Sequence, residues 1–261
     1  MPQSLSMPIR RAQAPVRRIS EADLRWALSK GWEDFKDRRG DVLVLVVLYP
    51  LVALVAAVTA FHASLLPLVF PLVAGLTIGG PAVASGFYEI SRRREAGLES
   101  SWVHVFDPLR GRGRTGLAIL TAGLSLLFVG WMGAAWLTYS ATIGADHWAG
   151  IAEFLRRLFS TPEGWTMIVL GNLTGLAFAC VTLAVAVVSF PMVVDKAVDP
   201  DVAVATSIRA VAANPVVMAS WGLRVAFLLV AGCLPAFLGL AVVLPVLGYA
   251  TWRLYTRLVE R

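Results

Sequence analysis

The stretch RTGLAILTAGLSLLFVGWMGAAWLTYSATIGAD at residues 114–146 decides the fold, because the 31 residues between Arg114 and Asp146 include no Asp, Glu, Lys or Arg. The hydrocarbon core of a bilayer is about 30 Å thick, and a helix needs about 20 apolar residues to cross it. Because no water reaches the backbone there, only α-helices and closed β-barrels span it. The apolar residues are continuous rather than alternating, which indicates a membrane-spanning helix.

Three further runs have the same character. Residues 42–88 include 47 residues and residues 164–194 include 31 without an acidic or basic side chain, and residues 210–252 carry one charge, Arg224. Two of the four runs are long enough for two spans each, and two for one. A soluble fold is disfavoured, because 15% of the residues are charged against about 25% in soluble domains. The fold class predicted is all-α, a polytopic transmembrane helical bundle with amphipathic interfacial helices and six spans, at about 42–61, 65–90, 116–139, 165–190, 215–234 and 235–252.

The chain divides into four segments. We expect a disordered tail at residues 1–18, an amphipathic helix at 19–41, the transmembrane domain at 42–252 and a tail at 253–261. In the helix, Ser20 and Asp23 form a capping-box pattern. The apolar stripe that follows, at spacings of four, four and three, is Leu24, Leu28, Trp32 and Phe35. This stripe is predicted to lie on the inner membrane surface, and packing on the cytoplasmic loops is the alternative.

Two further amphipathic helices are expected. One covers about 146–159 on the outer membrane surface, with Trp148, Ile151, Leu155, Leu158 and Phe159 as its apolar stripe. The other covers 199–213 on the inner side. A capping residue followed by proline marks three helix starts, at Thr161, Asp199 and Asn214.

The basic residues predict the orientation. With the N-terminus inside, 20 of the 23 Lys and Arg residues face the cytoplasm, Arg156 and Arg157 lie outside, and Arg224 falls within a span. Both termini are therefore predicted to be cytoplasmic. The net charge of +6 flanks the spans instead of forming one soluble basic domain, so we expect anionic lipid and no nucleic acid as a partner.

No pattern of a catalytic, cofactor or metal site is present. Cys180 and Cys233 lie in apolar segments without ligand spacing, and His62, His104 and His147 fall in separate loops. Walker and Rossmann glycine patterns are absent from the sequence. We expect a protein that is not an enzyme and has no cofactor.

Arg224 is the sharpest single signal. It lies nine residues after Pro215, about 13 Å along a helix, and so near the middle of the membrane. An ionisable group there costs at least about 2.5 kcal/mol and usually has a partner or faces water. Asn172 and Glu89 are the candidate partners, and the alternative is an arginine that reaches toward carbonyls or headgroups without further function.

A second candidate is a polar patch at the inner end of the second span. Tyr88 and Glu89 directly precede Ser91 and three arginines, Arg92, Arg93 and Arg94. Together with Arg110, Arg112 or Arg114, or with Asp195 and Lys196, they could bind the phosphate of a lipid headgroup, because an arginine fork binds phosphate through two hydrogen bonds. The alternative is an anchor that only sets topology, with a satisfied carboxylate.

Several motifs in order along the chain resemble one family. They are ISEADLRWALSKGWEDFKDRRGD at 19–41, LPLVFPLVAGLTIGGPAVASGFYE at 66–89, FYEISRRREAG at 87–97, Ser101-Trp102, SFPMVVDK at 189–196, TSIRAVAANP at 206–215 and VVLPVLGYATWRLYTRLV at 242–259. This is similar to a bacterial family of integral membrane proteins catalogued as a domain of unknown function (DUF 2189). The resemblance implies a multi-pass protein of the bacterial inner membrane and supplies no activity.

Two classes of function remain after these exclusions. The first is a non-enzymatic protein that binds, either organising a complex with other membrane proteins or copies of itself, or recognising anionic lipid headgroups at the cytoplasmic face. The second is a small-solute transporter or permease, for which the prolines and glycines of the spans and Arg224 as a counter-ion are the support. A membrane enzyme ranks third, because no paired acid and base are visible.

Overall fold

The structure is a computed structural model that describes residues 14–37, 71, 77–144, 151–235 and 239–260. Within these ranges the chain forms nine α-helices and two 3₁₀ helices, with no β-strand and one isolated bridge between Val16 and Val259. The prediction of an all-α protein is confirmed.

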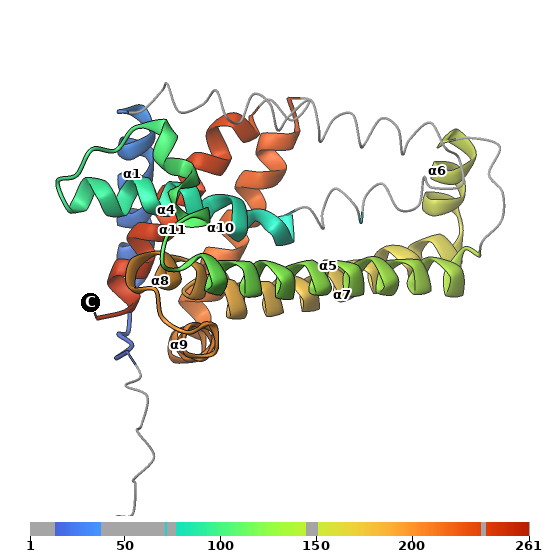
Figure 1. Cartoon of the computed structure of the whole chain (residues 1–261). Helices are drawn as coiled ribbons and strands as arrows, with labels where there is room; N and C mark the ends of the chain where they lie inside the picture. The colour runs from blue at the N-terminus through green and yellow to red at the C-terminus, as the bar shows by residue number, and fades with distance from the viewer. Residues whose placement is uncertain (1–13, 38–70, 72–76, 145–150, 236–238, 261) are drawn as a thin grey trace, which may run out of the picture.

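Two long helices dominate the molecule. Helices α5 (Arg114–Thr142) and α7 (Pro162–Ala186) lie side by side along their lengths (Figure 1). They pack through Trp131, whose ring lies edge-on to Phe178 at 5.6 Å and directly over Gly175. The 29 residues of α5 measure about 43 Å, which exceeds the ~30 Å hydrocarbon core.

Within the described residues, three stretches are long and apolar enough to cross a membrane. They are α5, the stretch Pro162–Lys196 made of α7 and α8 (Ser189–Lys196), and α10 (Pro215–Cys233). In the apolar 18-residue stretch of each helix, only 22% of the residues of α5 and 17% of those of α10 are buried. Most of these apolar side chains therefore face outward, as lipid-facing side chains do. The third, fourth and fifth spans predicted from sequence are confirmed as long apolar helices.

The other three predicted spans are covered differently. Residues 42–61 and, within 65–90, residues 65–70 and 72–76 lie outside the described residues. The end of the second span is visible as η3 (Thr77–Gly79) and α4 (Gly80–Glu95). The sixth corresponds to α11 (Leu240–Leu258). By length and composition this helix is not among those apolar enough to cross a membrane, and protein buries most of it from Pro245 to Leu258. The count of six spans stays a prediction.

Helix α1 (Glu21–Lys36) covers the buried part of α11. The two backbones approach so closely that a Cβ on Gly31 would lie 2.7 Å from the Ala250 nitrogen. Leu24 and Phe35 of the predicted stripe are buried by protein together with Ala27 and Gly31, whereas Trp32 is 45% exposed. The position of this helix on the membrane surface stays a prediction. The predicted capping box is confirmed, since the Asp23 carboxylate accepts the Ser20 backbone N–H at 2.9 Å.

The two ends of the described chain lie together. The Arg17 N–H donates to the Leu258 carbonyl at 2.8 Å, and the Glu260 N–H donates to the Pro15 carbonyl at 3.2 Å. Asn214 fastens the same segment, because its side-chain oxygen accepts the Ile19 N–H at 2.8 Å and its amide donates to the Arg17 carbonyl. Residues 15–17, assigned to the tail from sequence, thus pair with residues 258–260.

The predicted helix starts are found in the structure. Thr161 caps α7 by accepting the Gly164 N–H at 3.1 Å. Asp199 and Asn214 precede α9 (Pro200–Ala213) and α10, each with proline at the first helical position. The predicted amphipathic helix at 146–159 is α6 (Ile151–Ser160), with residues 146–150 outside the described part.

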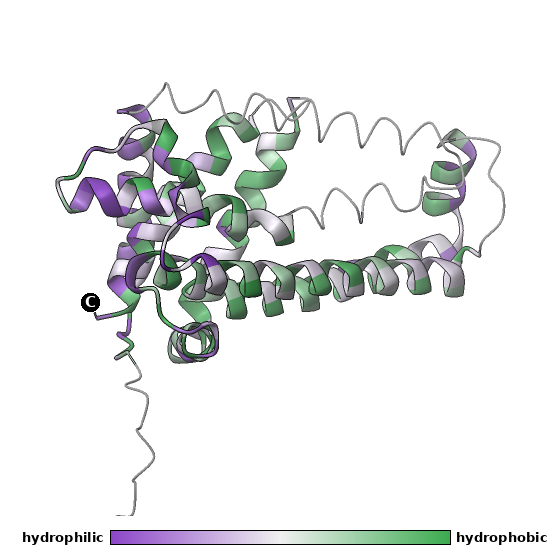
Figure 2. Cartoon of the chain, viewed as in Figure 1, coloured by the Kyte–Doolittle hydropathy of each residue, from purple (hydrophilic) through white to green (hydrophobic). Residues whose placement is uncertain are grey.

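Charged side chains gather at one end of the long pair. We call this the polar end, formed by α1, the last turn of α4, the 3₁₀ helix η4 (Trp102–Leu109), α8 and the last turns of α11. Helix α6 lies at the opposite end (Figure 1), and Figure 2 shows hydrophilic residues concentrated at the polar end while α5 and α7 stay apolar along their lengths.

Candidate functional site

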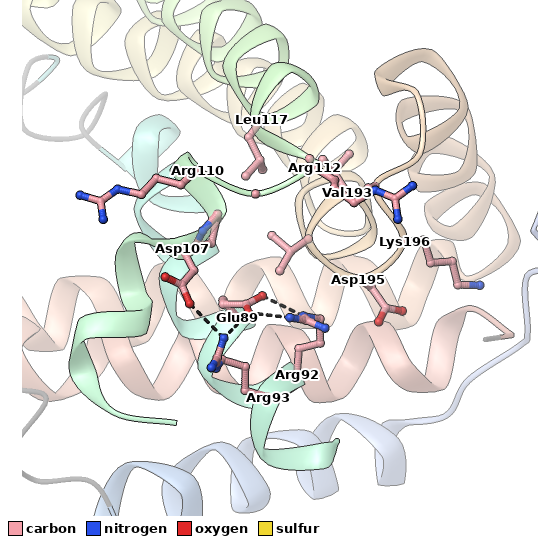
Figure 3. Close-up of a pocket in the computed structure, with 15 residues that line it drawn as sticks. Glu89, Arg92, Arg93, Asp107, Arg110, Arg112, Leu117, Val193, Asp195 and Lys196 are labelled. Carbon is pink, nitrogen blue, oxygen red and sulfur yellow. Dashed lines mark hydrogen bonds and ion pairs between the residues drawn. The ribbon is translucent and has the colours of Figure 1, made fainter. Parts of the chain in front are cut away.

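A cavity of about 780 Å³ opens at the polar end, where the start of α5 meets α4, η4 and α8 (Figure 3). Five basic and three acidic side chains line it, an excess of two positive charges. The full lining is Glu89, Arg92, Arg93, Asp107, Pro108, Arg110, Gly111, Arg112, Gly113, Leu117, Val193, Val194, Asp195, Lys196 and Ala197.

The floor of the cavity is an ion cluster on α4. Glu89, Arg92 and Arg93 share one face of the helix because they are three and four residues apart. Glu89, 5% exposed, accepts from the Arg92 Nε and Nη2 at 2.8 and 2.6 Å. The Arg93 Nη1 lies 3.0 Å from Asp107 Oδ2 and 3.8 Å from Glu89 Oε1. The hydrogen bonds to Glu89 raise the pKa of Arg92 above its ordinary value, which keeps the guanidinium charged.

A close helix contact forms the wall opposite the floor. A Cβ on Gly113 would lie 2.7 Å from the Val193 carbonyl, so glycine there lets the start of α5 approach α8. Leu117 and Val193 make this wall apolar. Asp195, from the last turn of α8, accepts the Tyr255 hydroxyl at 2.8 Å, which ties the wall to α11.

The rim carries cations with few partners. Arg110 and Arg112 are exposed and form no ion pair with any residue in the described ranges. Their guanidinium groups extend to opposite sides of the cavity (Figure 3). Lys196 donates to the backbone carbonyl of Glu260 at 3.0 Å. This acceptor is neutral, so the bond does not neutralise the positive charge of Lys196. An anion in the cavity would thus meet a neutralised floor and an uncompensated rim.

The structure brings only part of the predicted polar patch together. Glu89, Arg92, Arg93 and Asp195 line the cavity, as expected. Tyr88 is 2% exposed and stacks on Trp252 away from the cavity.

Arg94 also points elsewhere. Its Nη1 donates to Asp34 of α1 at 2.8 Å and its Nη2 to Asp37 at 2.5 Å. The side chain follows Arg92 and Arg93 in sequence but lies outside their helix face, so it serves the contact between α4 and α1.

Arg224 has a different partner from those proposed from sequence. Its Nη2 donates to Glu21 of α1 at 2.5 Å. Asn172 is exposed on α7 and donates to the Ile168 carbonyl one turn back, and Glu89 is occupied by Arg92. The candidate partners were therefore wrong, because the amphipathic helix folds back against α10 and supplies a carboxylate that no span provides. The bonds from Ser220 and Arg224 in turn lower the pKa of Glu21.

Two features of the polar end escaped sequence reasoning. Asp107 completes the floor, and its signal was its place in the arginine-rich DPLRGRGR stretch at 107–114. The second is a network around Asp34, which binds both Arg94 and Arg253. Nothing in the local pattern of α1 distinguishes Asp34 from its neighbours Glu33, which is half-buried, and Asp37, which is exposed.

The chemistry of the cavity suits an anion. Guanidinium forks bind phosphate and carboxylate through paired, charge-assisted hydrogen bonds. No group of three or more His, Cys, Asp and Glu that could hold a metal ion occurs in the described part of the chain.

Comparison with known proteins finds one family model, and its match covers most of this site. The model described as "Predicted integral membrane protein (DUF2189)" matches residues 69–195, a stretch that includes the whole cavity lining except Lys196 and Ala197. The match is shorter than the motifs suggested, since the stretches at 19–41 and 206–259 lie outside it. No curated protein and no solved structure matches the chain. Over residues 69–195 the chain matches the model of the DUF2189 family of predicted integral membrane proteins, the family that its sequence motifs resemble.

Proposed function

We propose that this membrane protein is a non-enzymatic, lipid-binding protein that holds the phosphate-bearing headgroup of an anionic lipid in the cavity of the polar end. The observation that carries the proposal is the position of a net-positive cavity at the end of a helix long enough to span the bilayer. At that depth the most abundant anions are lipid phosphates. Rim arginines without ion-pair partners in the described chain add the capacity to bind one.

The proposed setting is the bacterial inner membrane, with six spans and with the polar end and both termini in the cytoplasm. The basic residues support this orientation. Two contacts support an even number of crossings: residues 15–17 pair with 258–260, and Arg94 of α4 returns to Asp34 of α1. A chain whose ends meet crosses a membrane an even number of times.

Reporter fusions test this topology. Green fluorescent protein attached at either terminus should fluoresce, because it folds in the cytoplasm, while alkaline phosphatase inserted after Ser160 at the end of α6 should be active. Two results would overturn the orientation. One is activity of alkaline phosphatase fused at a terminus. The other is fluorescence of green fluorescent protein inserted after Ser160, where alkaline phosphatase is inactive.

Removal of the rim charges tests the cavity. The double variant Arg110→Gln and Arg112→Gln should lower the affinity for phosphatidylglycerol by about tenfold, or about 1.4 kcal/mol. The expected loss is smaller than the ~1.5–3 kcal/mol typical of one hydrogen bond to a charged group, because the rim is exposed to water. Native mass spectrometry of the detergent-solubilised protein, titrated with phosphatidylglycerol and phosphatidylcholine, measures the change.

The matched control is the double variant Arg156→Gln and Arg157→Gln on α6. It removes the same charge from the opposite end and should leave binding unchanged. Inorganic phosphate, titrated as a competitor, separates a lipid site from a soluble-phosphate site: the lipid should bind much more tightly than free phosphate. Equal losses in the two double variants, or no preference for phosphatidylglycerol, would rule the proposal out.

A further inference from the structure

The 3₁₀ helix η4 exposes three large apolar side chains on one side. Val103 is 54%, Phe106 43% and Leu109 68% exposed. A 3₁₀ helix has three residues per turn, so residues three apart share a face. The three side chains therefore form one apolar stripe, in a loop whose neighbours are otherwise charged.

The opposite side of η4 is already used by the fold. Val105 contacts α4 at Gly86, where an added Cβ would collide with its side chain. Asp107 binds Arg93, and Pro108 lines the cavity. These contacts hold η4 in one orientation, so the exposure of the apolar stripe follows from the packing of α4.

The position of η4 along the chain indicates what covers the stripe. Helix α5 begins at Arg114, five residues after Leu109, and is one of the stretches able to cross a membrane. Its ~43 Å length exceeds the hydrocarbon core by about 13 Å, so a centred helix emerges about 6 Å beyond each boundary. That places the segment before it at the depth of the headgroups.

The charges around the stripe match the same environment. Arg110, Arg112 and Arg114 follow it directly. A short amphipathic segment with apolar residues on one side and basic residues beside them is the pattern of interfacial membrane anchors. Anionic headgroups supply the complementary charge.

From these observations we infer that η4 is a membrane-inserting segment. Val103, Phe106 and Leu109 enter the boundary between headgroups and acyl chains of the leaflet at the polar end. Insertion keeps the cavity, which η4 helps to line, at the level of the lipid phosphates. The inference does not require that a headgroup occupy the cavity.

Site-directed spin labelling tests the inference. Cys180 and Cys233 are replaced by serine, and single variants Val103→Cys, Phe106→Cys and Leu109→Cys carry a nitroxide. The full chain is placed in nanodiscs of phosphatidylcholine and phosphatidylglycerol. At all three positions collisions with oxygen, which dissolves in the acyl region, should exceed collisions with a water-soluble nickel chelate several-fold. Glu99→Cys, exposed on the same connection, is the matched control and should show the reverse order.

Two outcomes would overturn the inference. Preferential access of the nickel chelate at position 106 would place the stripe in water, and low access of both reagents would place it against protein. The melting temperature in detergent is the control for folding. A labelled variant reports on the native fold when its melting temperature equals that of the unlabelled cysteine-free protein. Loss of headgroup binding in the rim variant leaves this result untouched, so the two proposals fail separately.

Discussion

Replacement of Asp34 by alanine should destabilise the protein by about 3 kcal/mol, the largest stability effect expected from one substitution at the polar end. Asp34 is 6% exposed, and its carboxylate accepts from Arg94 at 2.8 Å and from Arg253 at 2.9 Å. Loss of one partner of a buried ion pair typically costs about 3–5 kcal/mol. The lower end applies, because Asp37 still binds Arg94 and Glu95 still binds Arg253.

The physical consequence is the release of α1. Asp34 is the one carboxylate of the described chain that joins α1 both to α4 and to α11. We expect a lower unfolding midpoint in detergent and faster proteolysis within α1.

Glu33→Ala is the control, since Glu33 pairs with Lys30 of the same helix at 2.6 Å, and both side chains are more than two-fifths exposed. It should have almost no effect. Equal midpoints for the two alanine variants would contradict the role assigned to Asp34.

Replacement of Glu89 by glutamine should have the largest effect on binding of any single substitution, and in the unusual direction of a gain. Glu89 neutralises Arg92 through two hydrogen bonds and lies 3.8 Å from Arg93. Two unit charges 4 Å apart interact by about 4 kcal/mol at an effective dielectric constant of about 20. Partial exposure of the two arginines reduces this to an expected gain of about 1.4 kcal/mol, which is about tenfold in affinity for phosphatidylglycerol.

A lipid titration followed by native mass spectrometry measures the gain. Glu153→Gln is the matched control, because Glu153 forms the same three-residue spacing with Arg156 at the opposite end of the molecule. It should leave the affinity unchanged. Unchanged or weaker binding in Glu89→Gln would show that the floor arginines do not face the bound anion.

The long apolar helices were predictable because a membrane imposes a local condition. The absence of charge from 115 to 145 is sufficient to predict α5, and the same holds for α7. Helix α10 carries one charge, Arg224, and was predicted because the rest of its residues are uncharged. Capping residues such as Thr161 placed helix starts accurately for the same reason, since a cap depends on a few neighbouring residues.

The face of α1 could not be predicted in this way. A stripe of large apolar residues selected Trp32, whereas the contact with α11 uses Ala27 and Gly31. A close approach of two backbones depends on the partner helix, which the sequence of α1 does not include. That partner is far away in the chain: Asp34 and Arg253, which bond across the same contact, are 219 residues apart.

The candidate site was predictable to a similar extent. Its floor residues Glu89, Arg92 and Arg93 lie within five positions of one another, so their nearness in sequence was enough to group them in one polar patch. Asp107 and the partner of Arg224 came from other elements. Arg94 was grouped with the patch by adjacency, but its helix position turns it toward α1.

The sequence by itself determined that this protein is helical, which stretches are apolar enough for lipid and where its arginines accumulate, because those properties depend on residues close together in the chain. Only the tertiary structure decided which charges neutralise one another and which remain available at the cavity rim. Ion pairs form between side chains brought together by packing, so the choice of Glu21 for Arg224, and of Asp34 for both Arg94 and Arg253, exists only in the folded chain.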